Sequence, residues 1–408
     1  MRRIILFILS VVLLASMGSA CRLTNYMKVF SYDTSKINDS VINANNEFAF
    51  DIFKELSKED ADKSIFISPL SISTTLAMTY NGVESTTKDA MSKALRYNDI
   101  DRNIINESYS NLLRYLQKAD KKLELNIANS IWIREGEEIK EDFLKNNKSN
   151  FDAVIKSLDF SKDTAAGTIN KWISDSTKGK IDKMVESTID PDVIMYLING
   201  IYFKGQWSEK FDSERTYQKI FKAFNGNKEN VMMMRRKGEV EYKKGDDYEI
   251  VRLPYGNGKI SMYCILPDET IDINGYIDEM NAEKWINISE NIEEVDDVVL
   301  EIPKFKLEYG IKNLNKSLTA LGMGEAFSEQ ADFTGIREDV QISRVLHKAV
   351  IEVNEEGSEA AGATVVRVKS SATYTEYISF IADRPFIFVI ADDTTGAILF
   401  MGKLLSVD

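Results

Sequence analysis

The sequence predicts one large α+β domain whose sheets are mostly antiparallel. Helical spacing of apolar residues dominates the first part of the chain, whereas strand and hairpin patterns concentrate in the later part. No linker rich in proline, glycine or serine divides the chain after residue 45. With 408 residues, 44% of them hydrophobic, the chain can bury a large core. Separate groups of helices and strands are typical of the α+β class.

The spacing of apolar residues places the individual elements. Helices are expected around residues 48–56 and 105–116, and another is expected to start at Ser68-Pro69, where a serine cap precedes a proline in the first turn. Strands are expected over residues 123–133, 193–203, 298–307 and 348–353. Hairpins are expected at 250–266, with the turn Tyr255-Gly256-Asn257-Gly258, and at 386–401, with a turn over 392–396.

The first twenty residues read as a signal peptide. Arg2 and Arg3 precede an apolar run over residues 4–17, and the small residues Gly18-Ser19-Ala20 resemble a cleavage site. Cys21 follows directly, so the signal is either that of a lipoprotein, with Cys21 lipidated as a membrane tether, or that of simple secretion. Both alternatives predict an extracellular or cell-surface protein. Residues 21–44 are expected to form a polar tether, and residues 45–408 the folded domain.

Charge and cysteine content exclude several classes of protein. The net charge of −13 argues against nucleic-acid binding, which needs basic patches to neutralise phosphates. The short basic run 235–237 is interpreted as a solvated turn. Cys264 lies in an apolar run and is expected to be a buried hydrophobic residue, and two cysteines cannot build a disulfide framework.

The sequence contains no recognisable catalytic or ligand-binding motif. His347 is the only histidine, so any Ser-His-Asp or Cys-His triad would have to use it. The sequence contains no G-x-S-x-G elbow, no C-x-x-C pair and no glycine-rich phosphate loop. Paired carboxylates stay open, because acidic residues are abundant. We therefore expect no catalytic residue, no metal site and no cofactor, and a structural role for His347.

The segment 357–371 carries the clearest functional pattern. Its even-numbered residues are small or β-branched, whereas every charge falls on an odd-numbered residue: Glu359, Arg367 and Lys369. Because successive residues of a strand point to opposite faces, this pattern predicts a strand with its even-numbered residues against a core. On its own, the pattern fits an ordinary edge strand equally well.

From about residue 43 to the end, the chain resembles the serpin family. The resemblance rests on blocks that occur in family order and spacing. They are Ile65-Phe66-Ile67-Ser68-Pro69, Asn199 with Phe203-Lys204-Gly205-Gln206-Trp207, Ile302-Pro303-Lys304-Phe305, Val345-Leu346-His347-Lys348-Ala349, and Asp383-Arg384-Pro385-Phe386. A further block resembles the hinge of inhibitory members: Glu355, Glu356, Gly357, Ser358, Glu359, Ala360, Ala361, Gly362 and Ala363.

The resemblance implies eight or nine helices around three sheets, with an exposed reactive-centre loop from about residue 357 to 376. In this family a serine protease cleaves the loop and forms an acyl-enzyme. The cut loop then inserts into the central sheet and traps the protease before deacylation. The resemblance thus implies a suicide-substrate protease inhibitor that is a monomer and not an enzyme. The alternative is a non-inhibitory serpin with a binding or structural role.

The resemblance also assigns control points to particular residues. Asn199 and His347 match a buried hydrogen-bonded pair, with Ser68 and Ser71 beside it; we call these four residues the shutter. A second set, the breach, marks where insertion begins. It consists of Trp207, Lys304 and Glu355, with an ion pair expected between the last two.

The usual loop length places the scissile bond between Ser371 and Ala372. Ser371 implies elastase-like or subtilisin-like proteases as targets. If the register differs, Lys369 would imply trypsin-like targets and Tyr374 chymotrypsin-like ones.

Overall fold

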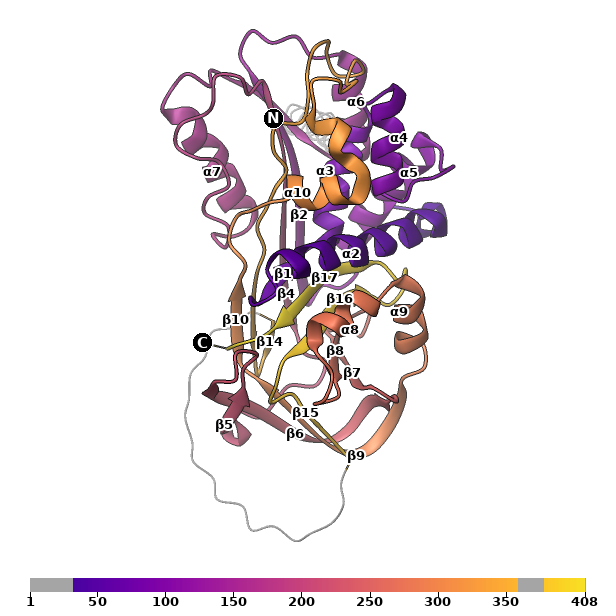
Figure 1. Ribbon diagram of the computed structural model, residues 1–408, viewed down its shortest axis with the longest axis vertical. Coiled ribbons are helices and arrows are strands. Elements are labelled where there is room, and N and C mark those ends of the chain that lie inside the picture. Colours follow the sequence, from indigo (N-terminus) through magenta and orange to yellow (C-terminus); the bar gives the residue numbers. More distant parts are fainter. Residues whose placement is uncertain (1–31, 359–377, 408) are drawn as a thin grey trace, which may run out of the picture.

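The computed structural model describes residues 32–358 and 378–407. Within these residues, nine α-helices surround three sheets of nine, six and two strands. Most helices gather around one end of the long strands, and the nine-stranded sheet fills the other end (Figure 1). The helices are α2 (Asp39–Glu59), α3 (Pro69–Tyr80), α4 (Ser85–Ala94), α5 (Arg102–Leu116), α6 (Glu141–Asn150), α7 (Thr164–Ser176), α8 (Ile273–Glu279), α9 (Ala282–Ser289) and α10 (Asn315–Leu318).

Among the described residues the strands pair almost entirely antiparallel, and only β2–β3 and β9–β15 are parallel. The nine-stranded sheet contains, in order, β1 (Ile65–Ile67), β17 (Ile398–Leu404), β16 (Phe386–Asp392), β8 (Ile260–Pro267), β7 (Tyr248–Tyr255), β6 (Lys228–Lys244), β9 (Glu293–Pro303) and β15 (Ser379–Ile381), with β5 (Tyr217–Lys222) on β6. The six-stranded sheet runs β10 (Phe305–Glu308), β13 (Val350–Asn354), β14 (Gly357–Ser358), β4 (Met195–Gln206), β2 (Leu123–Arg134) and β3 (Val154–Leu158). A short pair joins β11 (Lys312–Asn313) to β12 (Leu346–His347).

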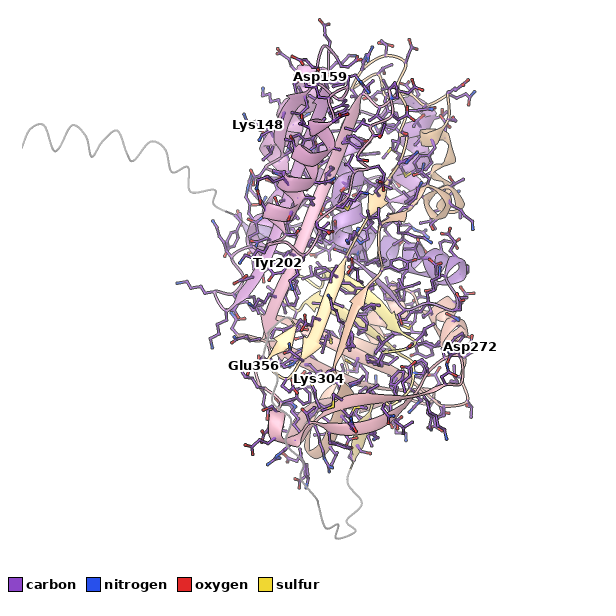
Figure 2. The ribbon with its side chains drawn as sticks, turned by 90° about the vertical axis from the view of Figure 1, so that its left-hand side faces the viewer. Lys148, Asp159, Tyr202, Asp272, Lys304 and Glu356 are labelled. Atoms are coloured by element: carbon purple, nitrogen blue, oxygen red, sulfur yellow. The ribbon has the colours of Figure 1, made fainter. Side chains whose placement is uncertain are left out.

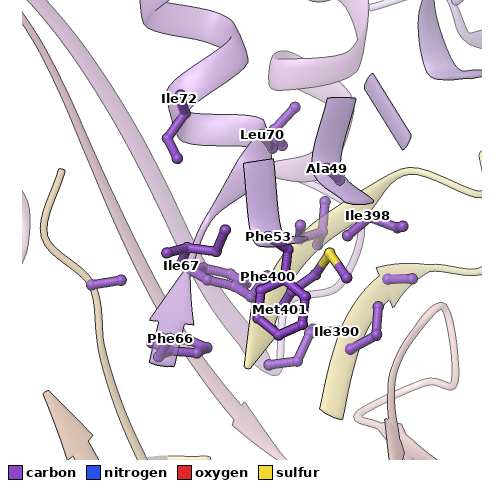
Figure 3. Close-up of a cluster of buried hydrophobic side chains, with 14 of the residues drawn as sticks. Ala49, Phe53, Phe66, Ile67, Leu70, Ile72, Ile390, Ile398, Phe400 and Met401 are labelled. Atoms are coloured by element: carbon purple, nitrogen blue, oxygen red, sulfur yellow. The ribbon is translucent and has the colours of Figure 1, made fainter. Parts of the chain in front are cut away.

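The main core lies between α2, α3 and the β16–β17 hairpin. Every residue of β16 and β17 is buried, which is why both strands are apolar apart from Asp392 and Lys403. Phe66 on β1 stacks on Phe400 of β17, with ring centroids 5.4 Å apart, and Phe53 of α2 reaches the same cluster (Figure 3).

A second, separate core lies under α7. Ile169 and Ile173 of α7 pack with Trp132 of β2 and Ile198 of β4. Helix α7 therefore covers one face of the six-stranded sheet, while α3 and the main core cover the other face.

The predicted α+β class is confirmed, and so are the two hairpins and the cap at Ser68, whose side chain accepts from the backbone of Ser71. The strand expected over 298–307 is divided at Lys304 into β9 and β10, which belong to different sheets.

Two interpretations of polar segments were wrong. The basic run 235–237 lies inside β6, where its side chains form ion pairs with neighbouring acids instead of a solvated turn. Residues 32–44 are not a tether, because α2 starts at Asp39 and buries Val41 and Ile42. Helix caps and polar helix starts resemble loops in composition, which explains the error. No helix in the described ranges has the length and apolar character to cross a bilayer.

Candidate functional site

The six-stranded sheet has an opening between β13 and β4, and β14 occupies only one end of it. Gly357 pairs with Asn354 and Gln206, and Ser358 pairs with Val353 and Gly205. Along the same edge, residues 195–204 of β4 have no other strand partner among the residues described. The sequence had placed the start of the exposed loop at Gly357. The structure instead places Gly357 and Ser358 inside the sheet, because each makes ladder pairs on both sides.

A cavity of about 560 Å³ follows the open edge of β4. Residues 195–199 of β4 line one side, residues 340–346 line the other, and Leu76 of α3 lies at the back. Five consecutive residues of a strand alternate between its two faces. The cavity therefore passes through the plane of the sheet, where one more strand could lie.

The expected ion pair of the breach is present beside β14. Lys304 Nζ lies 2.8 Å from Glu355 Oε2, and Thr216 Oγ1 donates to the other carboxylate oxygen. Burial alone would raise the pKa of Glu355, but the hydrogen bonds from Lys304 and Thr216 outweigh burial and leave this pKa below its usual value. Figure 2 labels Lys304 and Glu356 at this end of the molecule.

Trp207 fixes the chain segment that holds the hinge. Its indole nitrogen donates to the carbonyl of Asn354, and its backbone N–H donates to the carbonyl of Glu356. The backbone of Phe211 donates to the carbonyl of Glu355. These bonds tie the residues before β14 to the segment after β4.

Among the hinge residues that the structure describes, Gly357 is the one whose position admits only glycine. Its φ is +149°, and a Cβ there would lie 1.9 Å from the carbonyl oxygen of Gly205. Both the positive φ and the close approach of β4 therefore exclude any side chain at Gly357.

The shutter residues form a continuous hydrogen-bonded group at the start of α3. The backbone N–H of Ser68 donates to Nε2 of His347 over 3.0 Å, and the hydroxyl of Ser68 accepts from the backbone of Ser71. The hydroxyl of Ser71 donates to the side-chain oxygen of Asn199. His347 is buried, and burial lowers its pKa to about 4.

The direct bond expected between Asn199 and His347 is wrong in the described structure. Asn199 instead donates its amide to Asn129 Oδ1 over 2.6 Å, and Ser68 and Ser71 link it to His347. The opening of the sheet separates Asn199 on β4 from His347 on β12. The two serines at the start of α3 therefore connect them. Asn129 was missed because its pattern in β2 is that of an ordinary strand.

Several predicted residues lie outside the described residues: Cys21, Glu359, Ala360, Ala361, Gly362, Ala363, Lys369, Ser371, Ala372 and Tyr374. Within the described ranges, no group of histidine, cysteine and acidic side chains is arranged to hold a metal ion.

Replacing Lys304 with methionine is expected to destabilise the uncut protein by about 1–3 kcal/mol, because the buried carboxylate of Glu355 loses its cation. Urea unfolding of the uncut protein measures this. Lys306→Met is the control, since Lys306 is exposed on the same segment. Equal midpoints for the two variants would contradict a stabilising role for the ion pair.

The six-stranded sheet thus pairs with the two residues of β14 and leaves the rest of that edge of β4 without a strand partner among the residues described. A family model described as "Serpin (serine protease inhibitor)" matches residues 43–407. The chain is 36% identical to human "Serpin B8", over 90% of this chain and 100% of the relative. It is 34% identical to the "Leukocyte elastase inhibitor" of Sus scrofa, over 89% of this chain and 98% of the relative. The native-state structure of the thermophilic serpin tengpin superimposes with a TM-score of 0.81 at 33% identity, covering 92% of this chain and 96% of that one. The chain belongs to the serpin family.

Proposed function

We propose that this serpin inhibits serine proteases as a suicide substrate. The protease cleaves the reactive-centre loop, which follows β14 in the chain, and the cut segment then extends β14 along the open edge of β4. The observation that carries the proposal is the register of β14, which already pairs with both flanking strands.

Continuing that register gives a specific account of the inserted state. Thr364 would lie level with Asn199 on β4 and His347 on the other side. Val366 would lie level with Leu197 and Val345, both of which line the cavity. The hydroxyl of Thr364 would thus lie beside the shutter residues, and the side chain of Val366 would lie in the cavity.

The phase of the loop sequence agrees with this register. The odd-numbered residues 345, 347, 349, 351 and 353 are buried on the flanking side, and the register sets even-numbered loop residues beside them. Those even-numbered residues carry no charge from 358 to 370. Insertion would therefore bury only small, apolar or hydroxyl side chains.

This arrangement also supports a metastable uncut protein. Each added backbone bond contributes about 1 kcal/mol net, and each buried valine roughly 1.5–3 kcal/mol. The uncut state forgoes these contributions along the open edge, so a kinetic barrier must hold it.

The decisive experiment incubates the protein with elastase, subtilisin, trypsin and chymotrypsin. The expected result is a protease complex that survives boiling in detergent with at least one of them. Elastase-like or subtilisin-like enzymes are the proposed partners, supported by Ser371 and by the likeness to an elastase inhibitor. Cleavage by all four without any complex would favour the non-inhibitory alternative.

Cleavage by the trapped protease is expected between Ser371 and Ala372. Mass spectrometry of the released C-terminal fragment should therefore find Ala372 as its first residue. A first residue of Ser370 would assign the reactive bond to Lys369, and Thr375 would assign it to Tyr374.

We further propose that the protein is exported. The first twenty residues support export, and Cys21 is the candidate for lipid attachment. Partition of the processed protein into detergent, lost in Cys21→Ser, distinguishes lipid anchoring from simple secretion.

A further inference from the structure

Tyr255, at the end of β7, makes a side-chain contact with the hinge. Its hydroxyl lies 2.6 Å from the hydroxyl of Ser358, and both residues are almost completely buried. Ser358 is the last residue of β14, so this hydrogen bond holds the end of that strand.

Aromatic packing gives Tyr255 a fixed position. Its ring stacks on Trp207, with centroids 4.5 Å apart and planes 12° apart, and meets the edge of Phe203 on β4. Gly205 leaves room for the ring, since a Cβ there would lie 2.7 Å from it. Trp207 in turn holds the backbone before β14, so one rigid group contacts the hinge on both sides of Gly357.

We propose that Tyr255 is a positioning residue that holds Gly357 and Ser358 in the sheet before cleavage. The two residues then form a preformed nucleus, and insertion of the cut loop starts as extension of an existing strand. The inference deepens the proposed inhibition, on which its kinetic part rests.

The physical reason is the entropy of ordering the chain. Fixing residues in a strand costs conformational entropy before neighbouring contacts offset it. In this protein Gly357 and Ser358 have already lost that freedom. Both pair with β13 and β4, and Ser358 also bonds the hydroxyl of Tyr255. Without the bond, the buried hydroxyl of Ser358 lacks its partner, which favours release of β14.

Tyr255→Phe tests the proposal, because it removes one oxygen and keeps the ring. The first expected result is about fivefold faster hydrogen exchange in peptides that contain Gly357 and Ser358, the change that corresponds to one net hydrogen bond. The second is a similar slowing of spontaneous loop insertion on mild heating. The third is a larger fraction of cleaved, uncomplexed inhibitor after reaction with protease. In the Ser358→Ala background, Tyr255→Phe should change none of these quantities further.

Tyr97→Phe is the matched control. The Tyr97 hydroxyl bonds the hydroxyl of Tyr109 over 3.0 Å in the same main core, far from the hinge. A variant that only weakens the core should speed spontaneous insertion, so the two variants should shift its rate in opposite directions. If Tyr255→Phe also speeds insertion, or acts equally without Ser358, Tyr255 merely supports the fold. If the wild type traps no protease, the proposed inhibition is wrong. Hydrogen exchange then still tests the role of Tyr255: faster exchange at Gly357 and Ser358 in Tyr255→Phe supports it, and unchanged exchange contradicts it.

Discussion

Under the proposed inhibitory function, replacing Ser358 with arginine is expected to turn the protein into a protease substrate. Ser358 is 1% exposed, lies between Val353 and Gly205, and faces Tyr255. No acidic side chain is bonded to it, so a guanidinium there would be an unpaired buried ion, which costs several kcal/mol. The variant must therefore release β14 from the sheet. Insertion slows, and deacylation, which competes with it, completes the cleavage.

The measurement is the ratio of trapped protease to cleaved inhibitor on a denaturing gel. Ser358→Arg should be cut at the wild-type bond and yield almost no complex, because the distal loop is unchanged. Glu359→Arg is the matched control, since it introduces the same residue on the odd-numbered phase that carries the native charges. Trapping by Ser358→Arg at the wild-type level would show that insertion at β14 is not part of inhibition.

Lowering the pH from 7 to 5 is expected to weaken the shutter through His347. Nε2 of His347 accepts a hydrogen bond from the backbone of Ser68, and a protonated ring could not accept it. Burial lowers the pKa of His347 from 6.5 to about 4, so the unfolded chain binds a proton that the native state excludes. The contribution of His347 to the free energy of unfolding is thus largest above pH 6.5 and is lost as the pH falls towards 4. The whole contribution is about 3 kcal/mol.

The rate of spontaneous loop insertion between pH 7 and pH 4.5 measures this effect. Wild-type protein should insert faster as the pH falls below 6.5, whereas His347→Gln should insert fast at pH 7 and depend much less on pH. Peptide hydrolysis should be absent from both proteins at every pH. A steep dependence that survives in His347→Gln would assign the effect to carboxylates instead.

Much of the fold can be predicted locally. The hairpins at 250–266 and 386–401 follow from turn residues between apolar runs, and the start of α3 follows from Ser68 and Pro69. The uncharged even-numbered phase of the segment 357–371 is likewise visible in the sequence, because strand geometry has a period of two. Motif order then indicates the family.

Local patterns could not predict where strands end or which partner a polar group chooses. Lys304 lies within a run that reads as one strand, yet only the packing of two sheets assigns the halves to different sheets. Asn129 has no distinguishing pattern, and it joins the shutter because β2 lies beside β4.

The sequence by itself determined that the segment 357–371 can form a strand with one uncharged face of small or β-branched residues. Only the tertiary structure decided that this strand already begins at Gly357 in the intact chain and that the Tyr255 hydroxyl bonds the hydroxyl of Ser358. The physical reason is separation along the chain. Tyr255 and Ser358 are 103 residues apart, and His347 and Ser68 are 279 apart. The periodicity of a segment reflects neighbours within a few residues, whereas these bonds exist only after distant strands have packed together.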